Sequence, residues 1–142
     1  MDRGLVSRAS IAINASVEAV WNALVTPEII RKYMFGADVV SDWRENSPII
    51  WRGEYQGKKY EDKGVILGIN PGRLLQYSHY SPMSGKPDAP ENHHTVTMEL
   101  SEQGPATILT LSQDNNPTEE TREFTAKNWQ GMLEAVKKLL EE

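Results

Sequence analysis

The hydrophobic and polar positions in the last part of the chain repeat with the period of an α-helix. Over residues 116 to 141 the apolar side chains recur three and four positions apart, so they share one face, and most charged side chains fall on the opposite face. The first face consists of Thr125, Trp129, Met132, Leu133, Val136 and Leu140. This pattern predicts one long amphipathic helix, which needs a large concave partner.

Most of the chain before this helix alternates between polar and apolar residues, as half-buried strands do. A first strand at residues 5–13 is followed by helical spacing and by Pro27 as a first helical residue, which together predict two short helices. Further strands are expected at 38–43, 49–55, 59–69, 73–80, 95–101 and 107–113, with a proline-rich loop at 81–92. Consecutive hairpins predict an antiparallel sheet, and the whole order predicts an α+β fold with the sheet curved around the last helix.

Two local features carry specific expectations. In the strand at 59–69, Asp62 and Ile66 share one face while Val65 and Leu67 are apolar on the other, so a bulge that changes the phase is expected. At the start of the last helix, Asn116 followed three residues later by Glu119 predicts a capping pair.

Length and composition bound the class of protein. The 142 residues are expected to form a single domain, residues 1–142, that is large enough to bury a stable core without disulfides or a structural metal ion. There is no cysteine, which excludes disulfides and thiol chemistry and fits a cytoplasmic location. No apolar stretch is long enough for a membrane span, and the first residues lack the pattern of a secretory signal. A net charge of −5, without a basic cluster, argues against nucleic acid and anionic lipid surfaces as partners.

Alternation along the strands predicts which side chains face the helix. Charged residues mark the solvent face, so their neighbours point inward. A ligand cavity is expected between sheet and helix, with Tyr33, Phe35 and Met83 at its entrance. The wall is expected to comprise Trp51, Tyr55, Ile66, Tyr77, His79, His94, Val96, Met98, Trp129, Met132 and Leu133. The alternative is that these side chains simply form the core, as most buried aliphatic residues do.

Histidines are the candidates for catalysis. His93 and His94 are adjacent on a strand, so they point to opposite faces and do not share a ligand. His79 and His94 flank the proline-rich loop and both are expected to point inward, where they would relay a proton or line the wall. A zinc site needs a third ligand, for which only Asp62 or Asp88 is available, so no metal and no cofactor are expected.

Ordered segments of the chain resemble a known family. They are residues 15–24 (ASVEAVWNAL), 26–28, 47–53 (SPIIWRG), 60–64 (YEDKG), 69–77 (INPGRLLQY) and 129–141. Their order and spacing are similar to those of the START-like (SRPBCC) superfamily, in the branch of activator of Hsp90 ATPase homologue 1-like (AHSA1) proteins. The resemblance implies the helix-grip fold. It departs from the family at Tyr33-Met34-Phe35, where members often carry a Trp-Phe pair, so the pocket entrance is expected to have a different shape.

The resemblance implies several functions, because fold does not fix activity. The leading hypothesis is a small soluble protein that holds a hydrophobic or amphipathic small molecule, such as a lipid, between sheet and helix. The first alternative is a protein-interaction module that acts with an Hsp90-type chaperone, as in a stress response. The second alternative is a cyclase-like or hydrolase-like enzyme that uses His79 and His94.

Overall fold

A computed structural model describes residues 4–34, 36–82 and 85–141, except for the side chain of Tyr55. The strands β1 to β7 and the helices α1 to α3 follow the predicted order, with a short 3-10 helix, η2, added in the proline-rich loop. Their bounds are β1 Leu5–Ile13, α1 Val17–Val25, α2 Pro27–Tyr33, β2 Asp38–Ser41, β3 Pro48–Tyr55, β4 Lys58–Asn70, β5 Leu74–His79, η2 Pro90–Asn92, β6 His94–Gln103, β7 Ala106–Asn116 and α3 Glu119–Glu141.

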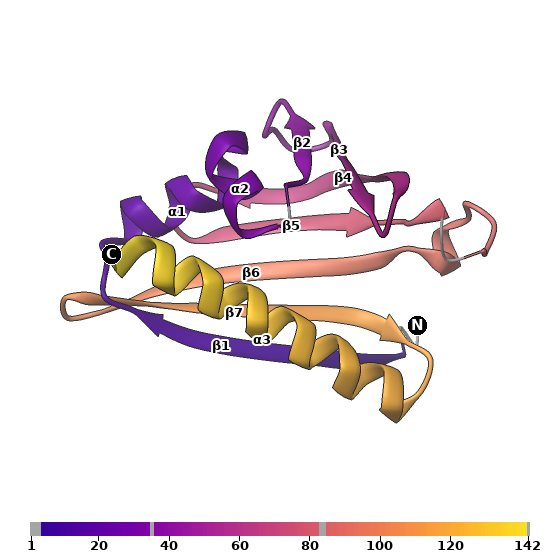
Figure 1. Ribbon diagram of the computed structural model, residues 1–142. Coiled ribbons are helices and arrows are strands. Elements are labelled where there is room, and N and C mark those ends of the chain that lie inside the picture. Colours follow the sequence, from indigo (N-terminus) through magenta and orange to yellow (C-terminus); the bar gives the residue numbers. More distant parts are fainter. Residues whose placement is uncertain (1–3, 35, 83–84, 142) are drawn as a thin grey trace.

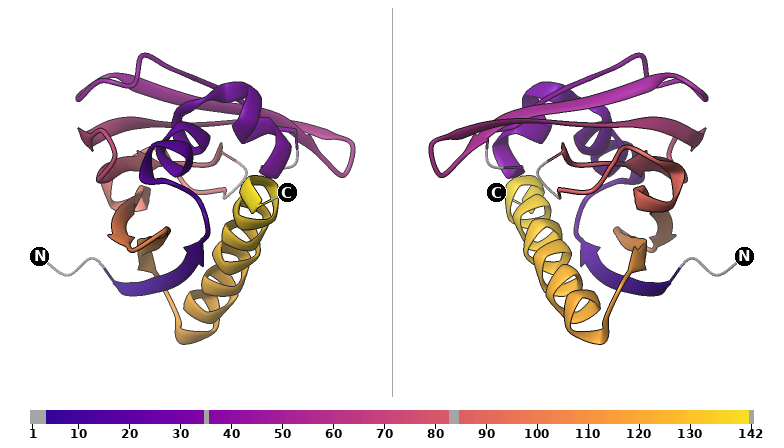
Figure 2. Two further views of the ribbon diagram at one scale, coloured as in Figure 1. Left: turned by 90° about the vertical axis from the view of Figure 1, so that its left-hand side faces the viewer. Right: turned by 90° about the vertical axis from the view of Figure 1, so that its right-hand side faces the viewer.

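The seven strands form one antiparallel sheet in the order β1-β7-β6-β5-β4-β3-β2. From β2 to β7, strands that are consecutive in the sequence are neighbours in the sheet. β1 lies at the opposite edge from β2 and pairs with β7. The sheet curves, and α3 lies along its concave side while α1 and α2 close one end (Figure 1, Figure 2). The expected helix-grip fold is therefore confirmed.

The core fills the space between the sheet and α3. Inward positions of the central strands, such as Ile66, Val96 and Leu109, have an exposed fraction of 0–1%. They meet Leu133 and Val136 of α3, which are equally buried. Only one face of α3 is apolar and the other carries polar residues. The helix is therefore stabilised mainly by packing of this apolar face against the sheet, and less by the helix propensity of its residues.

The expected bulge in β4 is present. The pairing of β4 with β5 shifts register between Ile66 and Gly68, so one extra residue lies on β4. Before the bulge Ile66 points into the core, whereas Val65 and Leu67 lie on the outer face with exposed fractions of 39% and 42%. The same irregular region brings Gly64 so close to β5 that a Cβ atom there would lie 1.7 Å from the backbone oxygen of Ser78.

The predicted start of the last helix was wrong. β7 continues to Asn116, and α3 begins at Glu119 after Thr118, whose hydroxyl accepts a hydrogen bond from the Thr121 backbone N–H at 3.1 Å. Asn116 does not cap the helix. Its buried side-chain amide donates to the Leu5 backbone oxygen at 2.9 Å and to Ser7 Oγ at 3.1 Å, so it fastens the end of β7 to β1.

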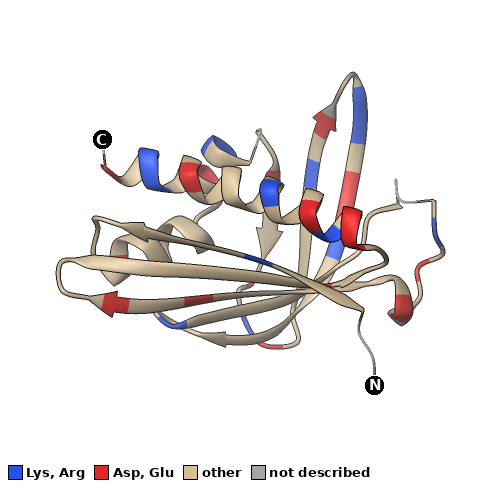
Figure 3. Cartoon of the chain, turned by 90° about the horizontal axis from the view of Figure 1, so that it is seen from below, with Lys and Arg blue, Asp and Glu red and all other residues tan. Residues whose placement is uncertain are grey.

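Charged residues of both signs are mixed along α3 and along the β3–β4 hairpin (Figure 3). On the hairpin, Arg52 and Glu61 form a cross-strand ion pair at 2.7 Å. Between residues 4 and 141, as far as they are described, no helix has the length and apolar character to cross a membrane.

Candidate functional site

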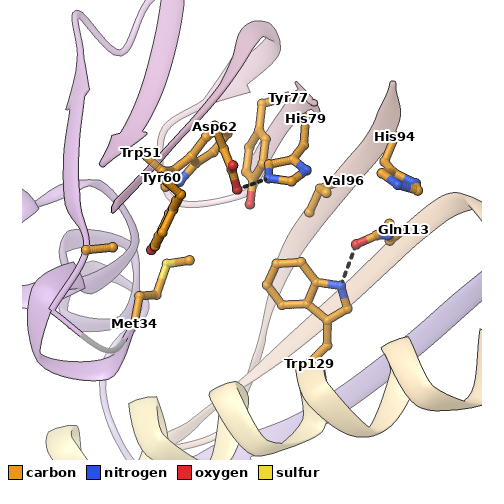
Figure 4. Close-up of a pocket in the computed structure, with 11 residues that line it drawn as sticks. Met34, Trp51, Tyr60, Asp62, Tyr77, His79, His94, Val96, Gln113 and Trp129 are labelled. Carbon is orange, nitrogen blue, oxygen red and sulfur yellow. Dashed lines mark hydrogen bonds and ion pairs between the residues drawn. The ribbon is translucent and has the colours of Figure 1, made fainter. Parts of the chain in front are cut away.

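A cavity of about 160 Å³ lies between the concave face of the sheet and α3. Strands β3 to β7 supply most of its wall, α3 contributes Trp129, and the segment after α2 contributes Met34 and Ala37. Figure 4 shows the strand side chains pointing toward Trp129 across the cavity. The lining residues are Met34, Ala37, Trp51, Tyr60, Asp62, Tyr77, His79, His94, Val96, Gln113 and Trp129.

Aromatic rings make up much of this wall. The ring of Trp51 lies 5.1 Å from that of Tyr77 and 5.1 Å from that of His79, in tilted and edge-on arrangements that aromatic pairs favour. Trp51 and Tyr77 are nearly fully buried, with exposed fractions of 5% and 4%. Burial raises the pKa of the Tyr77 hydroxyl, so the hydroxyl keeps its proton and remains a hydrogen-bond donor.

The polar end of the cavity is built around Asp62 and His79 on the adjacent strands β4 and β5. His79 Nε2 lies 3.0 Å from Asp62 Oδ2, and because an ionised carboxylate only accepts, the imidazole donates. The other carboxylate oxygen, Asp62 Oδ1, is buried and receives no hydrogen bond from the described residues. A buried polar atom without a partner is costly, so this oxygen marks a place where a donor from outside the protein would be stabilised.

His94 stands next to His79, with ring centres 6.3 Å apart. Its Nδ1 donates to the backbone oxygen of Asp114 at 3.0 Å, which leaves Nε2 as an acceptor in the neutral ring. Burial lowers the pKa of His94, and the neighbouring His79 acts in the same direction against the raising effect of the Asp114 carbonyl. At neutral pH His94 is therefore an uncharged acceptor at this end of the cavity.

Gln113 on β7 holds Trp129 in place. The Trp129 indole N–H donates to Gln113 Oε1 at 2.8 Å, as Figure 4 shows. Because the side-chain oxygen is used in this way, the amide group of Gln113 keeps two N–H donors. The tryptophan ring is thus held across the cavity by a bond between the helix and the sheet.

Two further hollows adjoin the cavity. One of about 340 Å³ shares Met34, Tyr60, Gln113 and Trp129 with it and opens between α2 and α3. Another of about 240 Å³ shares His79 and His94 and extends toward the proline-rich loop. The two histidines therefore lie between the cavity and a hollow that is also lined by Lys86 and Glu91.

The residues predicted for the cavity fall into three groups. Trp51, Tyr77, His79, His94, Val96 and Trp129 line it. Ile66, Met98 and Leu133 belong to the core, where Met98 borders a small void of about 20 Å³, whereas Met132 borders both this void and the adjoining hollow of about 340 Å³. The side chain of Tyr55 lies outside the described part of the chain.

The predicted entrance is only partly described. Tyr33 is buried and donates from its hydroxyl to the Ala23 backbone oxygen at 2.8 Å, while its ring borders the hollow between α2 and α3. Burial raises the pKa of this hydroxyl too. Phe35 and Met83 lie outside the described residues.

The two aspartates considered as metal ligands have different partners in different parts of the structure. Asp62 pairs with His79 inside the cavity, whereas Asp88 in the loop pairs with His93 at 2.6 Å and with Lys63. In the described ranges no three or more histidine or acidic side chains converge in a way that holds a metal ion. Acid–base catalysis by His79 and His94 stays a prediction.

Sequence reasoning missed several wall residues. Tyr60 and Asp62 share the inward phase of β4 with Ile66, so strand alternation alone contained the signal for both. Gln113 shares the inward phase of β7 with Leu109 and Leu111, so alternation contained a signal for this residue too, although it was not among the predicted wall residues. Met34 follows α2, and only the folded position of the helix brings it to the cavity.

Comparisons with known proteins agree with this architecture. Residues 14–141 match the family model described as activator of Hsp90 ATPase homolog 1-like protein. The solution structure of ChR145 from Cytophaga hutchinsonii is similar with 52% identity and a TM-score of 0.88, covering 99% of this chain and 97% of that chain. Among curated proteins, none matches.

More distant solved structures share the fold alone. Protein CV1439 from Chromobacterium violaceum has 21% identity and a TM-score of 0.77, covering 96% of this chain and 97% of that chain. The Aha1 dimer from Colwellia psychrerythraea has 18% identity and a TM-score of 0.75, with 96% of each chain covered.

Proposed function

The chain belongs to the family of activator of Hsp90 ATPase homolog 1-like proteins, and from this premise we propose that it binds an amphipathic small molecule between its sheet and α3. The observation that carries the proposal is the cavity of about 160 Å³ with rings on its walls and polar groups at one end. Ligand sites of proteins have this character: mostly apolar surface with a few convergent polar groups that orient the ligand.

The size of the cavity supports a ligand with one ring or a short chain inside it. A cavity of about 150 Å³ in another protein accommodates benzene. Larger ligands would extend past Trp129 and Met34 into the adjoining hollow of about 340 Å³, which shares these two residues with the cavity. The bound molecule would then have a ring or head inside and a tail directed toward the surface.

A ligand screen tests this function. Native mass spectrometry of the purified protein checks for a co-purified molecule, and a thermal-shift screen covers fatty acids, sterols, flavonoids and other polyketides. A ligand that binds only the folded state must raise the melting temperature, by an amount that grows with concentration. An empty protein whose melting temperature no chemical class changes would overturn the proposal.

A pair of variants ties any hit to the cavity. Val96 on β6 is 1% exposed and faces the cavity, so Val96→Phe fills part of it. Val65 on β4 is 39% exposed on the outer face, so Val65→Phe makes the same change away from the site. We expect Val96→Phe to abolish the thermal shift and Val65→Phe to keep it.

A second candidate function is protein interaction through α3. Phe124 is a large apolar side chain with an exposed fraction of 65% on this helix, where contact with a partner would bury it. An Hsp90-type chaperone is the partner that the family description indicates. A pull-down with such a chaperone tests this, comparing Phe124→Ser with Lys127→Ser, a change at an exposed position one turn away. Equal recovery of both variants would remove Phe124 from the interaction.

A further inference from the structure

The polar end of the cavity offers acceptors more than donors. Asp62 Oδ1 is buried without a hydrogen bond from the described residues, and the Asp62 side chain as a whole is 17% exposed. His79 uses its Nε2–H on the other carboxylate oxygen, so it cannot serve Oδ1 as well. In the neutral ring of His94, Nε2 is likewise an acceptor because Nδ1 donates to Asp114.

The charge at this end disfavours acids. A carboxylate ligand placed beside Asp62 would bring two like charges together in a site shielded from water, which costs far more than the same contact at the surface. Lys63 pairs with Asp88, Arg52 pairs with Glu61 on the outer face of the hairpin, and Lys86 lines the adjoining hollow on the far side of His79 and His94. None of these side chains lines the cavity.

The shape of the wall favours a flat body. Trp51, Tyr60, Tyr77 and Trp129 surround the space, and the volume of about 160 Å³ suits a single ring. A hydroxyl group on such a ring has one O–H donor, which needs one acceptor. An ammonium group has three N–H donors, and some of them would lack a hydrogen-bond acceptor in this mostly apolar cavity.

We propose that the cavity selects a phenol-type ligand, whose ring stacks among these aromatic side chains and whose hydroxyl donates to Asp62 Oδ1, and that it rejects carboxylic acids. This inference rests on the proposed small-molecule binding and adds the chemistry of the head group. Asp62 acts here as a specificity-determining residue that distinguishes ligands by the presence of a donor. Gln113 and the Tyr77 hydroxyl then serve further polar substituents of the ring.

Three probes of nearly equal size test the head group. 4-Propylphenol carries the donor, 4-propylanisole has it methylated, and 4-propylbenzoate replaces it with an anion. Dissociation constants are measured by NMR titration that follows the indole N–H signals of Trp51 and Trp129, which line the cavity. We expect the phenol to bind at least about tenfold more tightly than the anisole, because the anisole leaves the carboxylate oxygen unpaired. The benzoate is expected to bind more weakly still.

A matched pair of variants assigns the selectivity to one residue. Asp62→Leu removes the acceptor with a side chain of similar size, and Glu61→Leu makes a comparable change at the neighbouring, outward-facing position. In Asp62→Leu the ratio between phenol and anisole should fall to within about twofold, while Glu61→Leu should keep the wild-type ratio.

The outcomes separate this inference from the proposed function. Equal binding of phenol and anisole to the wild-type protein, or tightest binding of the benzoate, would overturn the phenol proposal and leave small-molecule binding intact. Tight binding of 4-propylaniline with weak binding of the phenol would replace the hydroxyl with an amine and also overturn it. If no probe binds, the phenol proposal falls, and the thermal-shift screen with the other chemical classes decides separately whether small-molecule binding falls as well. The ratio of the anisole and phenol dissociation constants in the wild-type protein tests the preference for a hydroxyl group even if Asp62→Leu does not fold.

Discussion

Trp129 on α3 and Gln113 on β7 are joined by a hydrogen bond of 2.8 Å from the indole nitrogen to the side-chain oxygen. Both residues also line the cavity. The bond therefore fixes the helix to the sheet at the place where a ligand would lie. We therefore expect this bond to contribute both to the stability of the fold and to the shape of the site.

Trp129→Phe keeps an aromatic ring but removes the donor, so we expect the free energy of unfolding to fall by about 1–2 kcal/mol. Urea denaturation followed by circular dichroism measures this. A double-mutant cycle with Gln113→Leu isolates the bond, and we expect a coupling of about 1 kcal/mol between the two positions. Purely additive effects would show that the bond contributes nothing.

Gly131 offers a stabilising substitution. It lies in the exposed part of α3, and no atom lies within 4 Å of the position that a Cβ would take. Gly131→Ala should therefore raise the free energy of unfolding by about 1 kcal/mol through helix propensity, and the melting temperature by about 3 °C.

Gly64 provides the contrast. A Cβ there would lie 1.7 Å from the Ser78 backbone oxygen, so Gly64→Ala must push β4 away from β5. We expect it to lower the free energy of unfolding by more than about 2 kcal/mol, measured by the same urea denaturation. If both alanine variants changed stability in the same direction, the account of the glycines would be wrong.

The fold was readable from the sequence because its main signals are periodic. Apolar residues recur with the helical period along α3 and at every second position along β3 and β6, because one face of each element is buried. Such a pattern identifies the type of element even when its predicted ends are wrong by a few residues. The start of α3 was not readable. Asn116 looks like a helix cap by its local context, but its side chain bonds to residues of β1 more than a hundred positions away.

The candidate site was readable only in part. Strand alternation identifies Trp51, Tyr77 and Val96 as inward, but it does not say which inward side chains close the core and which leave space. Ile66 has the same pattern and is fully packed in the core, and Met98 borders only a void of about 20 Å³. The distinction depends on how side chains from several strands and α3 fill the volume, and no local pattern encodes it.

Asn116 is expected to be important for stability. Its Nδ2 lies 2.9–3.1 Å from three acceptors, on Leu5, Ser7 and Gln113, and the side chain is 1% exposed. Asn116→Ala would leave one buried and two part-buried acceptors without this donor, so we expect a loss of about 2 kcal/mol in urea denaturation. Thr110→Ala, at an exposed position of the same strand, should change stability by less than about 0.5 kcal/mol. Comparable losses in the two variants would contradict this role for Asn116.

His94 should make stability depend on pH. Burial lowers its pKa in the folded protein below the unfolded value of about 6.5, so the unfolded chain binds more protons between these two values and stability rises with pH there. The contribution of His94 is complete above about pH 6.5 and is lost as pH falls through the folded pKa. His94→Asn keeps a donor for the Asp114 carbonyl but removes the titrating ring. Urea denaturation at intervals from pH 7.5 to pH 5 should show wild-type stability falling more steeply than that of His94→Asn, and parallel curves would mean that His94 does not carry the effect.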